Sequence, residues 1–286
     1  MLYQKIIIVR PNQSETAQPN KIAFFTITVM KCKNEVFCSM KHFVFLASVL
    51  VLFSLIAAKT DKTGESVVRK IHRAHAGKWY KTLTFQQNTK FYQNGVLAGE
   101  QTWYEAGIYP NLFRIDFGSP DSGNTYISRN DSAYLFRKGQ LMRATPEMNE
   151  LLFLYGGMYF LPEDTVISRM RSMGFDLSKT HRKKHNARKI VIVGAASGDT
   201  VSPQIWFDSE HHYIIRILRK RNGHQEDIRS GKHIRLGGAW CETEVIFYMD
   251  GKLLQEEFYS NCKANEPLDP RIFDPKAVGT VHWLKK

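Results

Sequence analysis

The sequence predicts an α+β protein: a curved antiparallel β-sheet, in the form of an incomplete, half-open barrel, with helices covering its concave face. Most of the chain after residue 80 alternates apolar and polar residues with a period of two, which is typical of strands with one face in a core. Asn94-Gly95 and a turn around Gly251 each join two such stretches as hairpins. The order helix, strands, helices, strands is that of one sheet with helices packed on a single face.

An export signal precedes the predicted domain. Two positive or titratable residues, Lys41 and His42, are followed by an uncharged apolar run from Phe43 to Ala58. The run is shorter than the roughly 20 apolar residues of a membrane span, and small residues end it, as in a signal peptide. We therefore expect cleavage after residues 40–58 and a periplasmic product in a Gram-negative bacterium. An uncleaved membrane anchor is the alternative.

Outside the signal peptide, the chain consists of an upstream segment and a predicted domain. Residues 1–39 fit no step of export, and we interpret them as a non-native upstream extension, with a genuine extension as the alternative. Residues 59–286 are of a size that forms a single domain with a substantial core. After residue 58 the chain holds 34 Lys and Arg against 25 Asp and Glu. This balance favours acidic partners such as anionic lipid headgroups, and export argues against nucleic acid.

A helix is expected at the beginning of the domain. Thr63 is placed to cap it, and Val67, Ile71 and His75 recur on one face at helical spacing. Gly77 is a favourable residue to end it.

The first strands carry their apolar residues at odd positions. Phe85 lies in the first strand, and a later one, Phe113 to Phe117, alternates apolar residues with Arg114 and Asp116. A strand of this kind has one covered face and one face in water.

Helices interrupt the strands after a predicted hairpin over residues 124–136. The run Leu151 to Leu154 carries more apolar surface than a helix needs for packing, and a second helix is expected from Pro162 to Met173. Pro at the start of that helix and Gly174 just past its end are typical limits. Residues 147–173 are termed the lid segment, since they would cover the concave face of the sheet.

Strands return after the lid segment, at residues 189–194, 203–207, 213–218 and 226–236 and in the hairpin around Gly251. Residues 179–189 hold six cations in a loop-like stretch, namely Lys179, Arg182, Lys183, Lys184, Arg188 and Lys189. A solvated basic loop is the simpler interpretation. A docking patch for an acidic membrane or partner is the other.

Cys241 and Cys262 flank the last predicted hairpin. A turn at Gly251-Lys252 would place them directly opposite each other, and a turn at Asp250-Gly251 would make them diagonal neighbours on one face. In an oxidising periplasm we expect a disulfide between them, with two buried free thiols as the alternative.

No motif for catalysis or metal binding stands out. His72 and His75, and His181 and His185, have ligand-compatible spacing, but carboxylate or thiolate companions at ligand spacing are missing. The sequence has no Gly-x-Ser-x-Gly elbow and no context for a triad. We therefore expect no cofactor, no metal and no enzymatic activity.

Three stretches resemble the LolA-type outer-membrane lipoprotein carriers and the related lipoprotein-sorting proteins. They are Tyr109-Pro110-Asn111-Leu112-Phe113-Arg114-Ile115-Asp116-Phe117, Pro203-Gln204-Ile205-Trp206-Phe207-Asp208 and Asn265-x-Pro267-Leu268-Asp269-x-x-x-Phe273-Asp274-Pro275. The resemblance extends over residues 65–275, and its motifs are structural. One position departs from the pattern: Tyr109 stands where the carriers have an Arg that holds the lid shut.

The resemblance implies the LolA/LolB fold and non-enzymatic shuttling of lipoproteins towards the outer membrane. Implied partners are lipoprotein acyl chains or another lipid, an inner-membrane release complex and an outer-membrane acceptor, with the carrier itself a monomer. The odd-numbered strand residues and the apolar lid run are then the expected lining of an acyl-chain site: Phe85, Phe113, Ile115, Phe117, Leu151, Leu152, Phe153 and Leu154. The same residues filling an ordinary core are the alternative, as is a periplasmic sensor or protein-interaction module with this fold.

Overall fold

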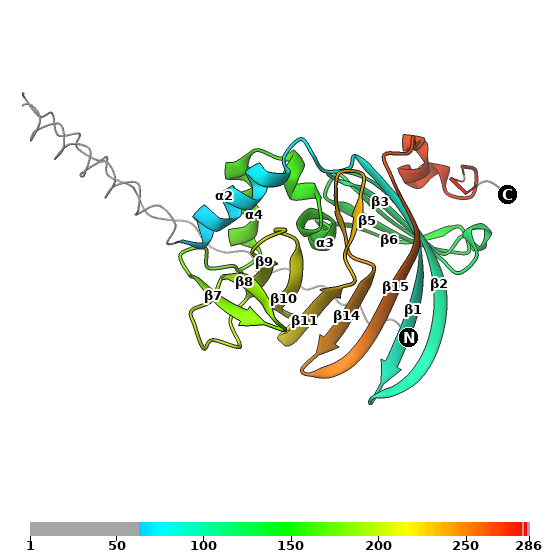
Figure 1. Ribbon diagram of the computed structural model, residues 1–286. Coiled ribbons are helices and arrows are strands. Elements are labelled where there is room, and N and C mark those ends of the chain that lie inside the picture. Colours follow the sequence, from blue (N-terminus) through cyan, green and yellow to red (C-terminus); the bar gives the residue numbers. More distant parts are fainter. Residues whose placement is uncertain (1–62, 282, 285–286) are drawn as a thin grey trace, which may run out of the picture. The chain divides into compact units, whose positions relative to one another are not determined.

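Thirteen antiparallel strands form one continuous, curved sheet (Figure 1). Its strands are β1 (Thr82–Gln93), β2 (Val96–Ile108), β3 (Leu112–Phe117), β4 (Thr125–Arg129), β5 (Ser132–Arg137), β6 (Gln140–Pro146), β7 (Thr180–His185), β8 (Arg188–Val193), β9 (Gln204–Asp208), β10 (Ile214–Arg221), β11 (His224–Gly231), β14 (Glu244–Met249) and β15 (Lys252–Ala264). They lie in the order β6-β5-β4-β3-β2-β1-β15-β14-β11-β10-β9-β8-β7. Within the described residues β6 and β7 do not pair, so the sheet stays open, and the predicted fold class is confirmed.

This structure is a computed structural model, and it describes residues 63–281, 283 and 284. The predicted signal peptide and residues 1–39 lie outside the described residues. Within the described part, no helix has both the length and the apolar character needed to cross a membrane.

Three α-helices lie together on one side of the sheet (Figure 1). They are α2 (Gly64–His75), α3 (Glu150–Leu154) and α4 (Glu163–Ser172), with the 3-10 turn η2 (Gly157–Phe160) between the last two. The remaining elements are a small hairpin of β12 (Ile234–Leu236) and β13 (Ala239–Cys241), and the 3-10 turns η1 (Pro120–Ser122), η3 (Pro270–Phe273) and η4 (Pro275–Ala277).

The limits of helix α2 follow from its sequence as predicted. The Thr63 hydroxyl accepts a hydrogen bond from the Ser66 amide at 3.2 Å, which satisfies one of the amide groups left open at a helix start. Val67 and Ile71 are buried on the inner face of the helix. Gly77, beyond the end, has φ = 74°, a conformation that glycine adopts without strain.

The turn at Asp250 decides between the two registers considered for the last hairpin. Asp250 and Gly251 have φ of 50° and 77°, as in a type I′ turn, and Met249 pairs with Lys252. The ladder of this hairpin ends at Glu244. Cys241 therefore belongs to β13, beyond the hairpin.

The main core lies between the sheet and the helices. Residues of α2, the lid segment and seven strands form one apolar cluster, which includes Val68, Leu154, Met170, Val193, Ile205, Phe207, Ile217 and Ile228. The sheet face that contributes to this cluster is termed the concave face, and the opposite one the convex face.

The convex face of β3 is buried, whereas the sequence predicted a face in water. Arg114 and Asp116 are only 2 % and 1 % exposed. Residues 268–281 and Trp283 pack over them with an apolar cluster of their own, in which Ile272 and Phe273 are buried. A chain segment far away in sequence thus covers this side.

Two segments that were not predicted as strands are strands. Residues 140–146 form β6, and most of the basic stretch 179–189 forms β7 and the start of β8, joined by a turn at Asn186-Ala187. The interpretation of that stretch as a loop was therefore wrong. Residues 226–236, expected as one strand, divide into β11 and β12.

Candidate functional site

The lid segment packs its apolar run directly on the concave face. Leu152, Phe153 and Leu154 are 7 %, 2 % and 0 % exposed and share the main core with Phe85 of β1. Leu151 and Phe113 are partly buried against the same cluster. Six of the eight residues expected to line an acyl-chain site are thus brought together.

The other two, Ile115 and Phe117, lie further along the same face. Phe117 contacts Trp103 of β2 edge to face, with ring centroids 4.9 Å apart, and Trp103 in turn lies 5.9 Å from the ring of Phe91. All three rings are half-buried. These rings, termed the aromatic row, extend the apolar face of the sheet beyond the buried cluster.

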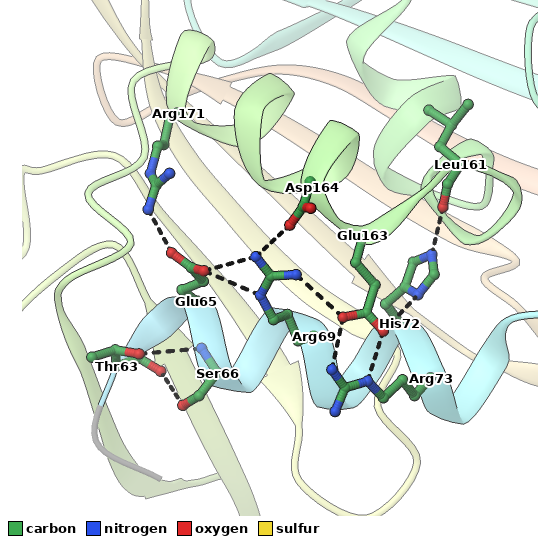
Figure 2. Close-up of polar contacts among 10 residues, drawn as sticks. All are labelled: Thr63, Glu65, Ser66, Arg69, His72, Arg73, Leu161, Glu163, Asp164 and Arg171. Carbon is green, nitrogen blue, oxygen red and sulfur yellow. Dashed lines mark hydrogen bonds and ion pairs between the residues drawn. The ribbon is translucent and has the colours of Figure 1, made fainter. Parts of the chain in front are cut away.

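Ion pairs fasten helix α4 of the lid segment to α2, as Figure 2 shows. From α2, Arg69 bonds Asp164 at 2.7 Å and Arg73 bonds Glu163 at 2.6 Å. In the other direction, Arg171 of α4 bonds Glu65 of α2 at 2.5 Å. The hydrogen bonds from Arg73 and Arg69 lower the pKa of the Glu163 carboxyl to about 2. The helices therefore carry complementary charges across their contact.

His72 adds a polar contact within the same interface. Its Nε2 lies 2.9 Å from the carbonyl oxygen of Leu161, two residues before α4 (Figure 2). His75, one turn on, packs its ring against Trp79 and Tyr159 at 5.1 and 4.9 Å. Burial lowers the pKa of His75 to about 4, so this histidine is neutral. Both histidines thus have structural partners in this interface.

Further polar contacts join the lid segment to the sheet itself. Glu150, at the first turn of α3, forms an ion pair with Arg219 of β10, which also bonds Glu226 at 2.5 Å. The hydroxyls of Tyr155 and Ser230 lie 2.5 Å apart. These contacts place lid polar groups on strands β10 and β11.

Tyr109, which replaces the arginine of the resembling carriers, also contacts the lid segment. Its ring stacks on Phe160 of η2, with centroids 5.9 Å apart and planes inclined by 12°. Close to it lies Gly156, with φ = 157°, where a Cβ would come within 2.5 Å of both Tyr109 and Trp79. Glycine is therefore needed for the lid segment to approach these rings.

The concave side also holds three buried or half-buried carboxyl groups that the sequence analysis missed. Burial, reinforced by the charge of Glu257, raises the pKa of Glu105 well above its usual range. Burial likewise raises the pKa of Glu257 to about 7, although hydrogen bonds from Tyr259 and Gln255 act to lower it. Burial also raises the pKa of Glu242 to about 8. The interior therefore favours these carboxyls in their neutral form.

A sequence signal for one of these carboxyls was available. Glu105 pairs with Phe85 on one side and Ile115 on the other, in the odd-numbered row that faces the core. Because side chains alternate between the two faces of a strand, the odd position of Glu105 was enough to place it on the face towards the core. In the part of the chain that the structure describes, no group of three or more His, Cys, Asp and Glu side chains could hold a metal ion.

Cys241 and Cys262 lie side by side as free thiols, the first buried and the second half-buried. A hydrogen bond between them raises the pKa of Cys241 and lowers that of Cys262. Their proximity fits the predicted disulfide, which stays a prediction.

A narrow cleft marks where the lid segment meets the strands. It lies among Pro110, Ser128, Phe153 and Arg169, and its volume of about 10 Å³ is that of a single water site. An acyl chain could enter here only if the lid segment moved.

Comparison with solved structures shows which known proteins share this fold. A DUF1329 family protein from Desulfovibrio piger aligns with a TM-score of 0.54 at 10 % identity, covering 75 % of this chain and 97 % of that one. An outer membrane lipoprotein-sorting protein domain from Vibrio parahaemolyticus gives a TM-score of 0.51 at 12 % identity, covering 77 % of this chain and 100 % of the domain. A LolA superfamily protein from Nitrosomonas europaea gives 0.47 at 11 % identity, with 74 % and 97 % covered.

These similarities concern the fold. No protein-family model and no curated protein matches the chain.

Proposed function

We propose that this protein is a non-enzymatic carrier of hydrophobic ligands in the periplasm, and that its cargo is the acyl chains of lipoproteins on their way to the outer membrane. The fold shared with a lipoprotein-sorting domain supports the carrier class. The finer assignment of cargo rests on the apolar chemistry of the concave face.

The observation that carries the proposal is how the lid segment is held. Its apolar run lies on the sheet, while its helix α4 is fastened by exposed or half-exposed ion pairs such as Arg73 with Glu163 and Arg169 with Asp131. Solvent-exposed pairs of this kind contribute little to stability and are readily exchanged for water. A cover with an apolar underside and weak polar fastenings can open and present that underside to a ligand.

The energy of the cargo explains why such a cover is needed. Each methylene withdrawn from water contributes about 0.8 kcal/mol, so a sixteen-carbon chain left in water costs on the order of 12 kcal/mol. The concave face would bury that chain, with the aromatic row of Phe91, Trp103 and Phe117 accommodating the part that extends beyond the lid segment.

A second function, a sensor or protein-interaction module, is favoured by one observation. Phe153 and Leu154 are almost fully buried against protein atoms alone. A core that is complete in this way has no need of a ligand.

Native mass spectrometry of the protein purified from periplasm separates the two functions. A carrier should hold lipid or lipopeptide in stoichiometric amount and pass it to vesicles. Protein that is always empty, and that captures no fluorescent acyl chain when vesicles are offered, would contradict the carrier function and favour the interaction module.

A further inference from the structure

A second pocket lies on the convex face, on the other side of the sheet from the helices. Ile205 and Phe207 of β9 belong to the main core, whereas Trp206 between them packs with Ile190 and Ile192 on the opposite side. A pocket of about 540 Å³ opens beside Trp206. We term it the convex-face pocket, and its lining includes His185, Arg188, Trp206, Arg216, Arg229 and Lys232.

Cations surround the ring of Trp206. Lys183 Nζ lies 4.0 Å from the ring centroid, and the guanidinium carbon of Arg216 lies 4.5 Å from it. Such cation–π contacts fix the two charges beside the pocket.

The arginines of the pocket outnumber the carboxylates that they contact. Arg216 and Arg229 share one carboxylate, Asp227, at 2.7 and 2.8 Å, so that two positive charges meet one negative charge. Both use Nε and Nη2 in the contacts described, which leaves the Nη1 group of each for a ligand. Lys232 pairs with Glu244 but remains 66 % exposed.

The response of His185 reports the sign of the local field. Burial lowers the pKa of His185, and the charges of Lys183, Arg216 and Arg229 lower it further. The part of this shift that comes from the three cations reflects a positive local charge, which attracts an anion.

We propose that the convex-face pocket binds the phosphoryl group of an anionic phospholipid headgroup and so docks the protein on a membrane surface. Guanidinium groups suit phosphoryl oxygens in geometry and charge. A lipid surface fits better than a soluble anion because the exposed side chain of Lys183, which lies beside Trp206 on the same face, continues the positive charge beyond the residues that line the pocket. The proposal does not depend on the carrier function, since the pocket and the lid segment lie on opposite faces.

Co-sedimentation with vesicles tests it, using phosphatidylglycerol vesicles and, as the neutral comparison, phosphatidylcholine vesicles. The wild type should bind the anionic vesicles selectively. The double variant Arg229→Gln/Lys232→Gln should bind them roughly 25-fold more weakly, since each cation near an anionic surface contributes about five-fold. The matched control Lys78→Gln/Lys263→Gln removes two exposed cations outside the pocket and should keep most of the binding.

Thermal unfolding checks that each variant is folded. If Arg229→Gln does not fold, the pair Lys183→Gln/Lys232→Gln replaces it, because neither of these side chains is part of the Asp227 contact. Equal losses in pocket and control variants would overturn the proposal in favour of net charge alone. Equal binding to both kinds of vesicle would also overturn it.

Inorganic phosphate separates a membrane site from a site for soluble anions. Phosphate added at the concentration of the vesicle phosphate groups should not release the protein from the vesicles. Release would overturn membrane docking. Native mass spectrometry should find the same amount of bound lipid in all these variants. A failure of the docking proposal is therefore distinguishable from a failure of the carrier function.

Discussion

Arg114 and Asp116, two residues apart on β3, form an ion pair that is almost completely buried between the sheet and the C-terminal segment. Nε of Arg114 lies 2.9 Å from Oδ2 of Asp116, and its Nη1 donates to the carbonyl oxygen of Ile272 at 2.9 Å. Asp116 also accepts hydrogen bonds from Thr125 and Trp283. The pair thus fixes residues 270–281 and Trp283 on the convex face.

The variant Asp116→Asn keeps the shape of this site but removes its negative charge. An uncompensated buried guanidinium should destabilise the fold by about 3–5 kcal/mol, measured by urea unfolding. Asp269→Asn, which removes an exposed partner of Arg271, is the control and should change stability little. Equal effects of the two variants would contradict the burial of the pair.

The charged contact between α2 and α4 should respond to salt. Glu163→Gln removes a carboxylate shared by Arg69 and Arg73, so the melting temperature should fall at low ionic strength. Because salt screens exposed charges, the difference from the wild type should shrink as sodium chloride is raised. A difference independent of salt would assign the effect to packing.

Stability should depend on pH through the interior carboxyls. Glu257 and Glu242 have pKa values raised from 4.5 to about 7 and about 8, so they bind protons more tightly in the folded state. Their contribution to the free energy of unfolding is complete below about pH 4.5 and is lost as the pH rises through 7 and 8. For Glu257 alone, from a pKa of 4.5 to about 7, this contribution amounts to about 3 kcal/mol.

The variant Glu105→Gln tests that account. It removes a buried carboxyl whose pKa is also raised, so its unfolding free energy should fall less steeply between pH 5 and 8 than that of the wild type. Glu163, with its pKa lowered to about 2, acts in the opposite direction and loses its contribution only as the pH falls below about 4.5. A wild-type stability that rises from pH 5 to 8 would refute this assignment.

The aromatic row offers a ligand test that spares the core. Phe117→Gln replaces a half-buried ring on the concave face, and Phe258→Gln makes the same change on the convex face. We expect both variants to fold and only the first to bind a fluorescent fatty acid more weakly. Phe153→Glu is a poorer test, because a charge at a position 2 % exposed should unfold the protein. Equal fatty-acid binding by both Gln variants would remove Phe117 from the site.

The two cysteines give a test of redox state. A disulfide between Cys241 and Cys262 should form in periplasmic protein and contribute roughly 3 kcal/mol by limiting the unfolded chain. Labelling of unreduced, denatured protein with a thiol reagent should then find neither residue. Two labelled thiols would show that they remain reduced.

Local rules predicted much of the fold from sequence. The Thr63 cap and the Asn94-Gly95 turn depend on neighbouring residues only, so they could be placed in advance. β6 was not predicted, because its pairing with β5 shifts by one residue between Leu135 and Phe136 and this shift disrupts the alternation of apolar residues. β7 was not predicted, because polar side chains occupy both of its faces.

The candidate site was predictable only in its apolar part. Parity placed Phe85 and Phe113 on the concave face, but the polar fastenings of the lid segment join residues far apart in sequence. Arg219 and Glu150, for example, are 69 positions apart, and no local pattern connects them. The buried state of Arg114 likewise depends on a segment more than 150 residues away.

Among the strands that the structure describes, β7 forms one edge of the sheet, and its sequence, Thr180-His181-Arg182-Lys183-Lys184-His185, has a consequence for the protein in concentrated solution. An open sheet offers unpaired backbone groups along its last strand, to which the same strand of a second molecule can add. Pairing β7 with β7 would bring six Lys and Arg side chains of two molecules into one small area, three from each. Mutual repulsion there protects the open edge from fibril-like growth, a protection that closed barrels obtain by having no edge at all.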